Sequence, residues 1–378
     1  MTKERAPGAR IAFAGGGTGG HLTPGLHLLD QLVSDAADGS ALPPADLLWF
    51  VSGRAVETLV LAGLEAQVSP CAVDGQALVL EPPGGGAPSL ARLARHAAPA
   101  TLVARRALRA HRSDCLLGLG GFTSLPAVLA ARSLRIPVYL LEVNAVAGRA
   151  TRWLSPFATR VFHAFPSSLP ASKGERDQLS GAPLPPRRAW QLDREEERRK
   201  WGVAGEEPLL AVLGGSQGAQ GLNDFMRSAA PLLASRGIKV RHQVGPGRMA
   251  EGADPVDGYR ALEYIEHVPS LLAAADFVLS RGGAFTLAEV AAAGVPAWVV
   301  PYPHHVDRHQ ARNAMAFGAG FEIIQEEGLS EERALELTDL MGPSGQERRD
   351  QMRSTLAALQ RPESSRTILQ QMAVMPRD

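Results

Sequence analysis

The sequence predicts an α/β protein with two domains, each a parallel sheet with helices on both faces. A length of 378 residues suits two domains, since a single domain usually holds roughly 100–200 residues. One pattern recurs four times: a short apolar run, a glycine cluster and a helix-like stretch. Short apolar runs bounded by turns are typical of buried parallel strands, and their alternation with helical stretches is typical of doubly wound sheets.

The four glycine clusters follow the apolar runs that we interpret as central strands. Further strands are predicted from apolar runs that alternate with helical stretches. The clusters lie at 15–20, 118–121, 214–218 and 282–283, and the further strands at 47–51, 138–141, 239–244 and 297–300.

A stretch rich in Pro, Ser and Gly, 166–186, has the composition of a linker. It separates an N-terminal half, 1–165, from a C-terminal half, 187–345. The polar, arginine-rich tail, 346–378, is helical in pattern and is expected to pack back toward the N-terminal half as a closing helix. Two doubly wound halves that face each other leave a cleft at the carboxyl ends of both sheets, where open α/β folds bind ligands.

The composition excludes several classes of protein. Lysine plus arginine and aspartate plus glutamate both total 39, so the net charge is zero and a wholesale nucleic-acid binder is not expected. The two cysteines fit a reducing compartment without a thiolate metal site. No apolar stretch suits a signal peptide or a membrane span, so a cytoplasmic protein is expected.

Glycine loops after strands suit an anionic ligand, because backbone amides and the positive end of the next helix can approach it. The first loop is not a Walker A loop, since no Gly-Lys-Ser/Thr follows. Its Gly-x-Gly-x-x-Gly spacing lacks a clear ribose-binding acid about 20 residues on, so a dehydrogenase fits poorly. His21 follows this loop, and it is either a structural histidine or a functional one at the mouth of the cleft.

Two segments of the C-terminal half have a structural and a functional interpretation. Thr286 and Glu289 have the spacing of a capping box, while Glu289 could instead accept hydrogen bonds from a ribose diol. Asp307 could cap a helix, or its segment could place Gln310 at a sugar. No Asp-x-Asp pair occurs, so we expect amides and helix dipoles, rather than a metal ion, to stabilise a departing diphosphate.

These residues resemble the MurG family of bacterial peptidoglycan N-acetylglucosaminyltransferases over about residues 10–325. In chain order, the motifs that carry the resemblance are Gly16-Gly-Thr-Gly-Gly-His21 with Pro24-Gly25, Gly120-Gly121-Phe122, Glu142 with Asn144 and Gly148, Gly214-Gly-Ser-Gln-Gly-Ala219, Gly283-Ala-Phe-Thr-Leu-Ala-Glu289, and Pro301-Tyr-Pro-His with Asp307, Gln310 and Asn313.

The resemblance implies the GT-B fold, with two doubly wound Rossmann-like domains facing a cleft. It implies transfer of N-acetylglucosamine from UDP-N-acetylglucosamine to the 4-hydroxyl group of undecaprenyl-diphosphate-linked N-acetylmuramoyl pentapeptide, with inversion and without a cofactor. The candidate catalytic base is His21, with Glu142 in reserve. The implied substrate-binding residues are Thr18, Gly19, Gly20 and Asn144 from the N-terminal half, Ser216 at the nucleotide, Ile265 at uracil, Ala284, Phe285 and Thr286 at the diphosphate, Leu287 and Ala288 beside them in the donor site, Glu289 at the ribose and Gln310 at the sugar.

The chain departs from the family pattern at three places. The family's Asn-Pro-x-Arg is Ala-Pro-Leu-Pro here, so Pro185 replaces an arginine that contacts the donor, and Arg187 or Arg188 could substitute for it. The other departures are Leu-Glu-Val-Asn at 141–144 and Arg-Gly-Gly-Ala at 281–284. A related GT-B enzyme with another lipid or glycan acceptor and a catalytically weak UDP-sugar-binding homologue therefore stay open as alternatives. A UDP-sugar 2-epimerase is disfavoured by the loop before His21.

A lipid-linked acceptor requires the enzyme to reach a membrane. Residues 87–113 contain six arginines and two histidines interleaved with apolar residues, and they contain no acidic residue. This basic, amphipathic segment predicts peripheral contact with an anionic membrane surface, on the cytoplasmic face of the plasma membrane. It contains no aromatic residue that could stack on a base, which disfavours nucleic acid as the partner.

Overall fold

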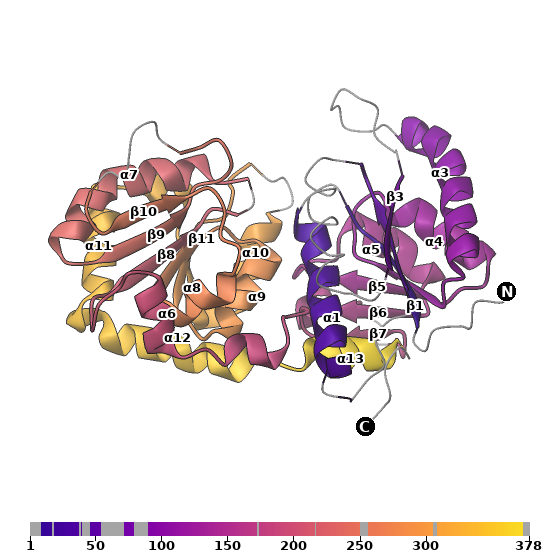
Figure 1. Ribbon diagram of the computed structural model, residues 1–378. Coiled ribbons are helices and arrows are strands. Elements are labelled where there is room, and N and C mark those ends of the chain that lie inside the picture. Colours follow the sequence, from indigo (N-terminus) through magenta and orange to yellow (C-terminus); the bar gives the residue numbers. More distant parts are fainter. Residues whose placement is uncertain are drawn as a thin grey trace. The chain divides into compact units, whose positions relative to one another are not determined.

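The computed structural model divides the chain into two compact units. One consists of Met1–Pro186 with Glu363–Asp378, and the other of Arg187–Pro362. Figure 1 shows their strands and helices, coloured along the sequence. The structure describes residues 9–16, 19–37, 39, 46–53, 72–78, 90–171, 174–215, 217–249, 256–304 and 308–372.

The first unit contains a seven-stranded, all-parallel sheet in the order β3-β2-β1-β4-β5-β6-β7. Its strands are β1 (Arg10–Ala14), β2 (Asp46–Val51), β3 (Ala72–Ala77), β4 (Cys115–Gly118), β5 (Val138–Glu142), β6 (Arg160–His163) and β7 (Asp177–Leu179). Its helices are α1 (Gly19–Ala37), α3 (Leu90–His111), α4 (Ser124–Ser133), α5 (Arg149–Leu154) and α13 (Ser364–Gln371).

Helices bury both faces of this sheet, which explains why its strands are apolar without alternation. Every second residue of β1, β2 and β5 joins one core cluster with side chains of α3 and α4, as Ala12, Leu48 and Leu140 illustrate. On the opposite face, α1 approaches closely, and Gly25 of α1 lies against the ring of Trp49.

The second unit contains a six-stranded, all-parallel sheet in the order β10-β9-β8-β11-β12-β13. Its strands are β8 (Leu209–Leu213), β9 (Lys239–Gln243), β10 (Tyr259–Leu262), β11 (Phe277–Ser280), β12 (Ala297–Val299) and β13 (Phe321–Ile323). Its helices are α6 (Arg194–Lys200), α7 (Gln220–Ser235), α8 (Val268–Ala274), α9 (Ala284–Ala292), α10 (His309–Met315), α11 (Glu331–Met341) and α12 (Gln346–Leu359).

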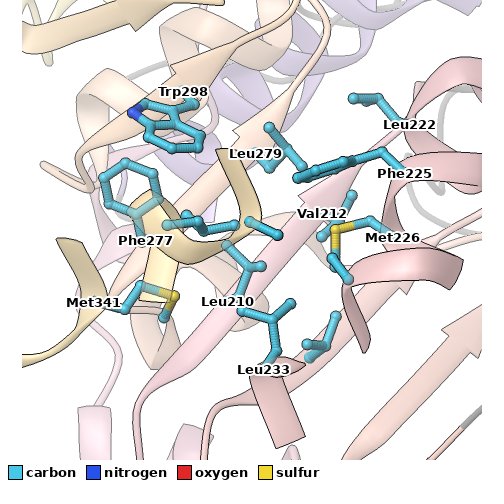
Figure 2. Close-up of a cluster of buried hydrophobic side chains, with 14 of the residues drawn as sticks. Leu210, Val212, Leu222, Phe225, Met226, Leu233, Phe277, Leu279, Trp298 and Met341 are labelled. Carbon is cyan, nitrogen blue, oxygen red and sulfur yellow. The ribbon is translucent and has the colours of Figure 1, made fainter. Parts of the chain in front are cut away.

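One buried cluster holds the second sheet to its covering helices (Figure 2). Leu279 of β11 lies beside Phe225 of α7, and Leu210 of β8, Trp298 of β12 and Met341 of α11 belong to the same cluster. All five side chains are at most 5% exposed. Their alternate spacing along each strand directs one face of the sheet toward this core.

The predicted doubly wound α/β class is confirmed in both units, and every strand predicted from an apolar run is present. The apolar pattern did not predict β3, β6, β7, β10 or β13. Of these, β3, β7, β10 and β13 are edge strands. An edge strand has a neighbour on one side only, so its sequence tolerates polar residues such as those of β3, Ala-Val-Asp-Gly-Gln-Ala.

The boundaries of the units lie elsewhere than the linker composition suggests. Residues 166–186 belong to the first unit, because β7 pairs in parallel with β6. Within the expected tail, α12 belongs to the second unit, and α13 belongs to the first. Ser365 Oγ accepts a 3.0 Å hydrogen bond from the Leu184 amide and donates a 2.6 Å hydrogen bond to the Leu184 carbonyl oxygen, and this pair holds α13 beside the 166–186 segment.

We predict that Arg366→Ala destabilises the first unit by about 1–2 kcal/mol, because it leaves the Asp35 carboxylate of α1, which is 1% exposed, without its 2.6 Å ion pair. The Arg366 side chain is 35% exposed, so solvent screening keeps the loss below that of a fully buried pair. Chemical unfolding measures the change. Arg361→Ala removes an exposed arginine five residues away and should leave stability within about 0.5 kcal/mol; equal losses in both variants would contradict the role of the ion pair.

Candidate functional site

The four glycine clusters follow the two central strands of each sheet. In the first sheet they follow β1 and β4, and in the second they follow β8 and β11. Strand order reverses between these neighbours, and loops that leave such a pair diverge to opposite faces of the sheet. Ligands of open α/β sheets bind at this reversal, so each unit carries a candidate site at the carboxyl edge of its sheet.

In the second unit, backbone packing holds the loop after β8 against the loop after β9. Gly218 has a φ of +70°, and a methyl group there would overlap the carbonyl oxygen of Val244. The Asn223 amide of α7 donates a 3.1 Å hydrogen bond to the same carbonyl oxygen. Glycine is therefore needed at this position for conformation and for close approach. Ser216, expected at the nucleotide, lies outside the described residues.

The loop after β11 is held by two side chains of α10. Gln310 accepts hydrogen bonds at its Oε1 from the amides of Gly282, at 3.3 Å, and Tyr302, at 2.8 Å. Asn313 donates from Nδ2 to the Gly282 carbonyl oxygen at 3.1 Å. A methyl group at Gly282 would overlap the backbone of Gln310. These contacts hold the loop where it enters α9, and they use the Oε1 atom of Gln310, so that its Nε2 amide group takes no part in them.

The capping-box interpretation of Thr286 and Glu289 is wrong. Helix α9 begins at Ala284 with Gly283 as its N-cap, so Thr286 lies inside the first turn. The N-cap residue, Gly283, has no side chain that could cap the helix, and first-turn amides have no acceptor within a helix. The loop conformation, rather than a cap, starts the helix here, and its amides and positive dipole end lie at the carboxyl edge of the sheet.

Asp307, which the sequence suggested as a helix cap, lies outside the described residues. Helix α10 begins at His309, and its N-cap residue is Arg308, with a φ of +46° and no side-chain hydrogen bond. Gln310 therefore lies in the first turn of α10, beside the loop that it holds.

Along α9, the side chains predicted for the diphosphate and ribose differ in their exposure. Leu287 is fully buried, and Ala284, Phe285 and Ala288 are each 8% exposed, so these four mainly form the core. Thr286 and Glu289 are half-buried and, three residues apart, share a helix face. Ile265, expected at uracil, is 3% exposed, so only its backbone can serve a base there.

Desolvation raises the pKa of Glu289 to about 8. A carboxyl group kept neutral at pH 7 in this way favours a partner that replaces lost hydration with hydrogen bonds, as vicinal hydroxyl groups do. A strongly shifted group beside a helix N-terminus at a strand-order reversal marks a functional candidate.

In the first unit, four hydrogen bonds hold the Glu142 carboxylate. Its Oε1 accepts from the amide and the side chain of Asn144, at 3.0 and 3.2 Å. Its Oε2 accepts from the amide of Gly148 at 2.7 Å and from the hydroxyl of Thr151 at 2.6 Å. The side chain is only 2% exposed. This carboxylate therefore orders the loop between β5 and α5, and Thr151 is a contributor that no sequence motif indicated.

The loops after β1 and β4 are joined by one hydroxyl group. Ser124 Oγ, at the start of α4, lies 2.9 Å from the carbonyl oxygens of both Ala14 and Gly120. His21 lies in the first turn of α1, which begins at Gly19. Thr18 lies outside the described residues, and the side-chain position of His21 is not described; Gly19 and Gly20 are known only as part of the helix backbone.

Arg281, between β11 and the glycine pair, is a second contributor that sequence patterns did not single out. Its guanidinium donates to the carbonyl oxygen of Val300 at 3.1 Å and pairs with Glu326. Forty-five positions separate the two charges, and no periodic pattern spans that distance. By contrast, Arg187 and Arg188, considered as substitutes at Pro185, are exposed.

Two family models match the chain. The glycosyltransferase family 28 N-terminal domain matches residues 11–163, and the glycosyltransferase family 28 C-terminal domain matches residues 209–359.

Curated relatives match over most of their length. The UDP-N-acetylglucosamine–N-acetylmuramyl-(pentapeptide) pyrophosphoryl-undecaprenol N-acetylglucosamine transferase of Halorhodospira halophila is 37% identical over 327 residues, which cover 83% of this chain and 84% of the relative. The protein of the same name from Synechococcus sp. (strain CC9311) is 35% identical over 310 residues, covering 82% of this chain and 81% of the relative.

Solved structures with the same fold include Acinetobacter baumannii MurG, which is 26% identical and has a TM-score of 0.71 over 98% of this chain and 100% of that chain. A UDP-GlcNAc 2-epimerase from Neisseria meningitidis, 14% identical, reaches a TM-score of 0.63 over 96% of this chain and 99% of that chain, and it is similar in fold alone.

We predict that, as the pH rises from 4.5 to 8, the wild type loses free energy of unfolding relative to the Glu289→Gln variant. The loss is up to about 1.4 kcal/mol per pH unit. In this range the folded protein keeps the carboxyl proton, while the unfolded chain, with an ordinary pKa of 4.5, has lost it. Unfolding therefore releases a proton, and rising pH favours unfolding. Denaturant titrations at several pH values measure the difference.

The matched control is Glu206→Gln, which changes an exposed glutamate. Its difference from the wild type should not vary with pH over this range. A pH-independent difference for Glu289→Gln would show that the carboxyl group ionises normally in the folded protein.

Proposed function

The chain belongs to the MurG family within glycosyltransferase family 28, and we propose that it transfers N-acetylglucosamine from UDP-N-acetylglucosamine to the 4-hydroxyl group of undecaprenyl-diphosphate-linked N-acetylmuramoyl pentapeptide. Its fold is the two-domain α/β fold of GT-B glycosyltransferases. The observation that carries the proposal is that α9 starts from a glycine N-cap at the strand-order reversal, with Glu289 on the next turn.

The second unit binds the donor. The amides of the first turn of α9, from Ala284 to Thr286, and the positive end of its dipole face the diphosphate, and Glu289 accepts hydrogen bonds from the ribose diol. The Gln310 amide meets the sugar hydroxyls from its Nε2 end, since its Oε1 already holds the loop. The backbone of Ile265 serves uracil, and Ser216 contacts the nucleotide.

The first unit supplies the groups that activate and orient the acceptor. The acceptor hydroxyl oxygen attacks the anomeric carbon, the bond from that carbon to the UDP oxygen breaks, and UDP leaves with the electron pair. His21 takes the hydroxyl proton, and Thr18, Gly19, Gly20 and Asn144 approach the substrates. Amides and the dipole stabilise the departing UDP without a metal ion or cofactor.

Glu142 orders its loop and stays the reserve base. Its carboxylate accepts four hydrogen bonds, which fix its position in the loop between β5 and α5. Two of the four bonds come from Asn144, so Glu142 fixes the residue that approaches the substrates.

Contact with an anionic membrane surface brings the enzyme to its lipid-linked acceptor, on the cytoplasmic face of the plasma membrane. Within the described part of 87–113, Leu102 and Val103 of α3 are 56% and 37% exposed, and Arg106, Arg109 and Arg112 are exposed. Exposed apolar side chains beside arginines favour an anionic lipid surface over a purely solvated helix face. Among the described residues, no helix is long and apolar enough to cross a bilayer.

The central test is incubation with UDP-N-acetylglucosamine and a short-chain lipid-linked muramoyl pentapeptide. We expect UDP release that depends on this acceptor, and a fall in kcat of at least about a hundredfold for His21→Ala, the usual size of a general-base contribution. Release with other lipid or glycan acceptors instead would favour a related glycosyltransferase. Tight UDP binding without turnover would favour a binding homologue.

Vesicle co-sedimentation tests the membrane contact. The wild type should bind anionic liposomes, and Arg105, Arg106 and Arg109→Ala together should weaken binding, since each arginine near anionic lipid contributes about 1 kcal/mol. A triple variant of Arg227, Arg236 and Arg260, exposed arginines of the second unit, makes the same change in net charge and should bind normally. Equal binding by all three proteins would refute the assignment to α3.

A further inference from the structure

A partly buried ion pair connects the carboxyl ends of four adjacent strands in the second sheet. Arg281, directly after β11, pairs with Glu326 of the 3₁₀ turn after β13, Glu326–Gly328. The two side chains are 11% and 25% exposed. The same guanidinium donates to the carbonyl oxygen of Val300 after β12, and the Arg281 amide donates to Leu213 of β8 at 3.4 Å.

The Glu326 carboxylate also has a fixed place against α7. A methyl group on Gly221, in the first turn of α7, would lie 2.5–2.8 Å from the carboxylate carbon and oxygens. The side chain therefore fills the space that a Cβ at 221 would need. Here the carboxylate lies near the positive end of α7 and against the Arg281 guanidinium, both of which stabilise its negative charge.

Arg281 also leads directly into the donor loop. Gly282 and Gly283 follow it, and α9 begins at the next residue. The Arg281 guanidinium lies over the Tyr302 ring, 5.8 Å from its centroid. The amides of Tyr302 and Gly282 both donate to the Oε1 of Gln310. Contacts through Tyr302 and Gln310 therefore link the Arg281 ion pair to the loop that starts α9.

We propose that Glu326 is a positioning residue for the donor site, which holds Arg281 so that the loop into α9 presents its amides to the diphosphate of a nucleoside-diphosphate sugar. The proposal rests on the proposed function. Without the carboxylate, Arg281 keeps its charge in a nearly buried place with carbonyl partners alone, and its guanidinium turns toward solvent. The loop then loses its fixed end, and its amides are no longer preorganised for the phosphates.

Calorimetric binding of UDP to the full chain, together with donor kinetics, tests this role through Glu326→Ala, Glu326→Gln and Gly221→Ala. We expect Glu326→Ala to raise the Kd for UDP and the donor KM about tenfold, because Arg281 loses its ion-pair partner, with a smaller change in kcat. Glu326→Gln, which keeps the volume and an acceptor oxygen, should recover part of the affinity. Gly221→Ala should reproduce Glu326→Ala, because the new methyl group displaces the carboxylate.

The double variant separates positioning from a general loss of packing. Gly221→Ala with Glu326→Ala should bind UDP no more weakly than Glu326→Ala alone, since the added methyl group then has space. Glu327→Ala removes the exposed neighbouring carboxylate and should bind UDP normally. If the wild type binds UDP, two results would refute the positioning role and leave the proposed function standing. One is an additive loss of affinity in the double variant, and the other is unchanged UDP binding by Glu326→Ala. A wild type that fails to bind UDP would refute the proposed function together with this inference.

Discussion

Backbone-to-backbone packing at the carboxyl edge of the second sheet is the constraint on which the candidate donor site depends. The loop after β8 lies against the loop after β9 so closely that Gly218 has no room for a side chain, and Gly282 meets the backbone of Gln310 in the same way. Loops held by such contacts have few alternative conformations. The helices that follow them therefore begin at fixed places, and the amides of their first turns are oriented before any ligand arrives.

In the second unit, the loops after β8 and β11 lead into α7 and α9, and the N-termini of these two helices differ in the charge that lies beside them. The first turn of α7 already has the Glu326 carboxylate against it, paired with Arg281. Helix α9 has glycine, which carries no side chain, at its N-cap. An incoming diphosphate would meet the protein's own negative charge at α7, whereas at α9 it meets amides and a positive dipole end. Glu289, one turn further on, is held neutral by desolvation and adds little repulsion.

Glu142 and Glu289 are both acidic residues near a carboxyl edge, yet their surroundings make them chemically different. Glu142 accepts four hydrogen bonds and orders a loop. Glu289 is desolvated, which destabilises its charge. Residue type and position in the chain do not distinguish them, because the difference arises from the donors that the fold brings around each carboxyl group.

The sequence by itself determined the α/β class, the two sheets, the central strands and the glycine loops, because apolar runs and turn residues act over a few neighbouring positions. Glycine spacing also located the start of α1 and the loops that enter α4, α7 and α9. Only the tertiary structure decided that Thr286 lies within α9, that 166–186 supplies an edge strand, that α12 and α13 belong to different units and that Arg281 finds Glu326. These outcomes depend on contacts between residues far apart in the chain, and local periodicity carries no information about which distant partner will satisfy a buried charge or a strand edge.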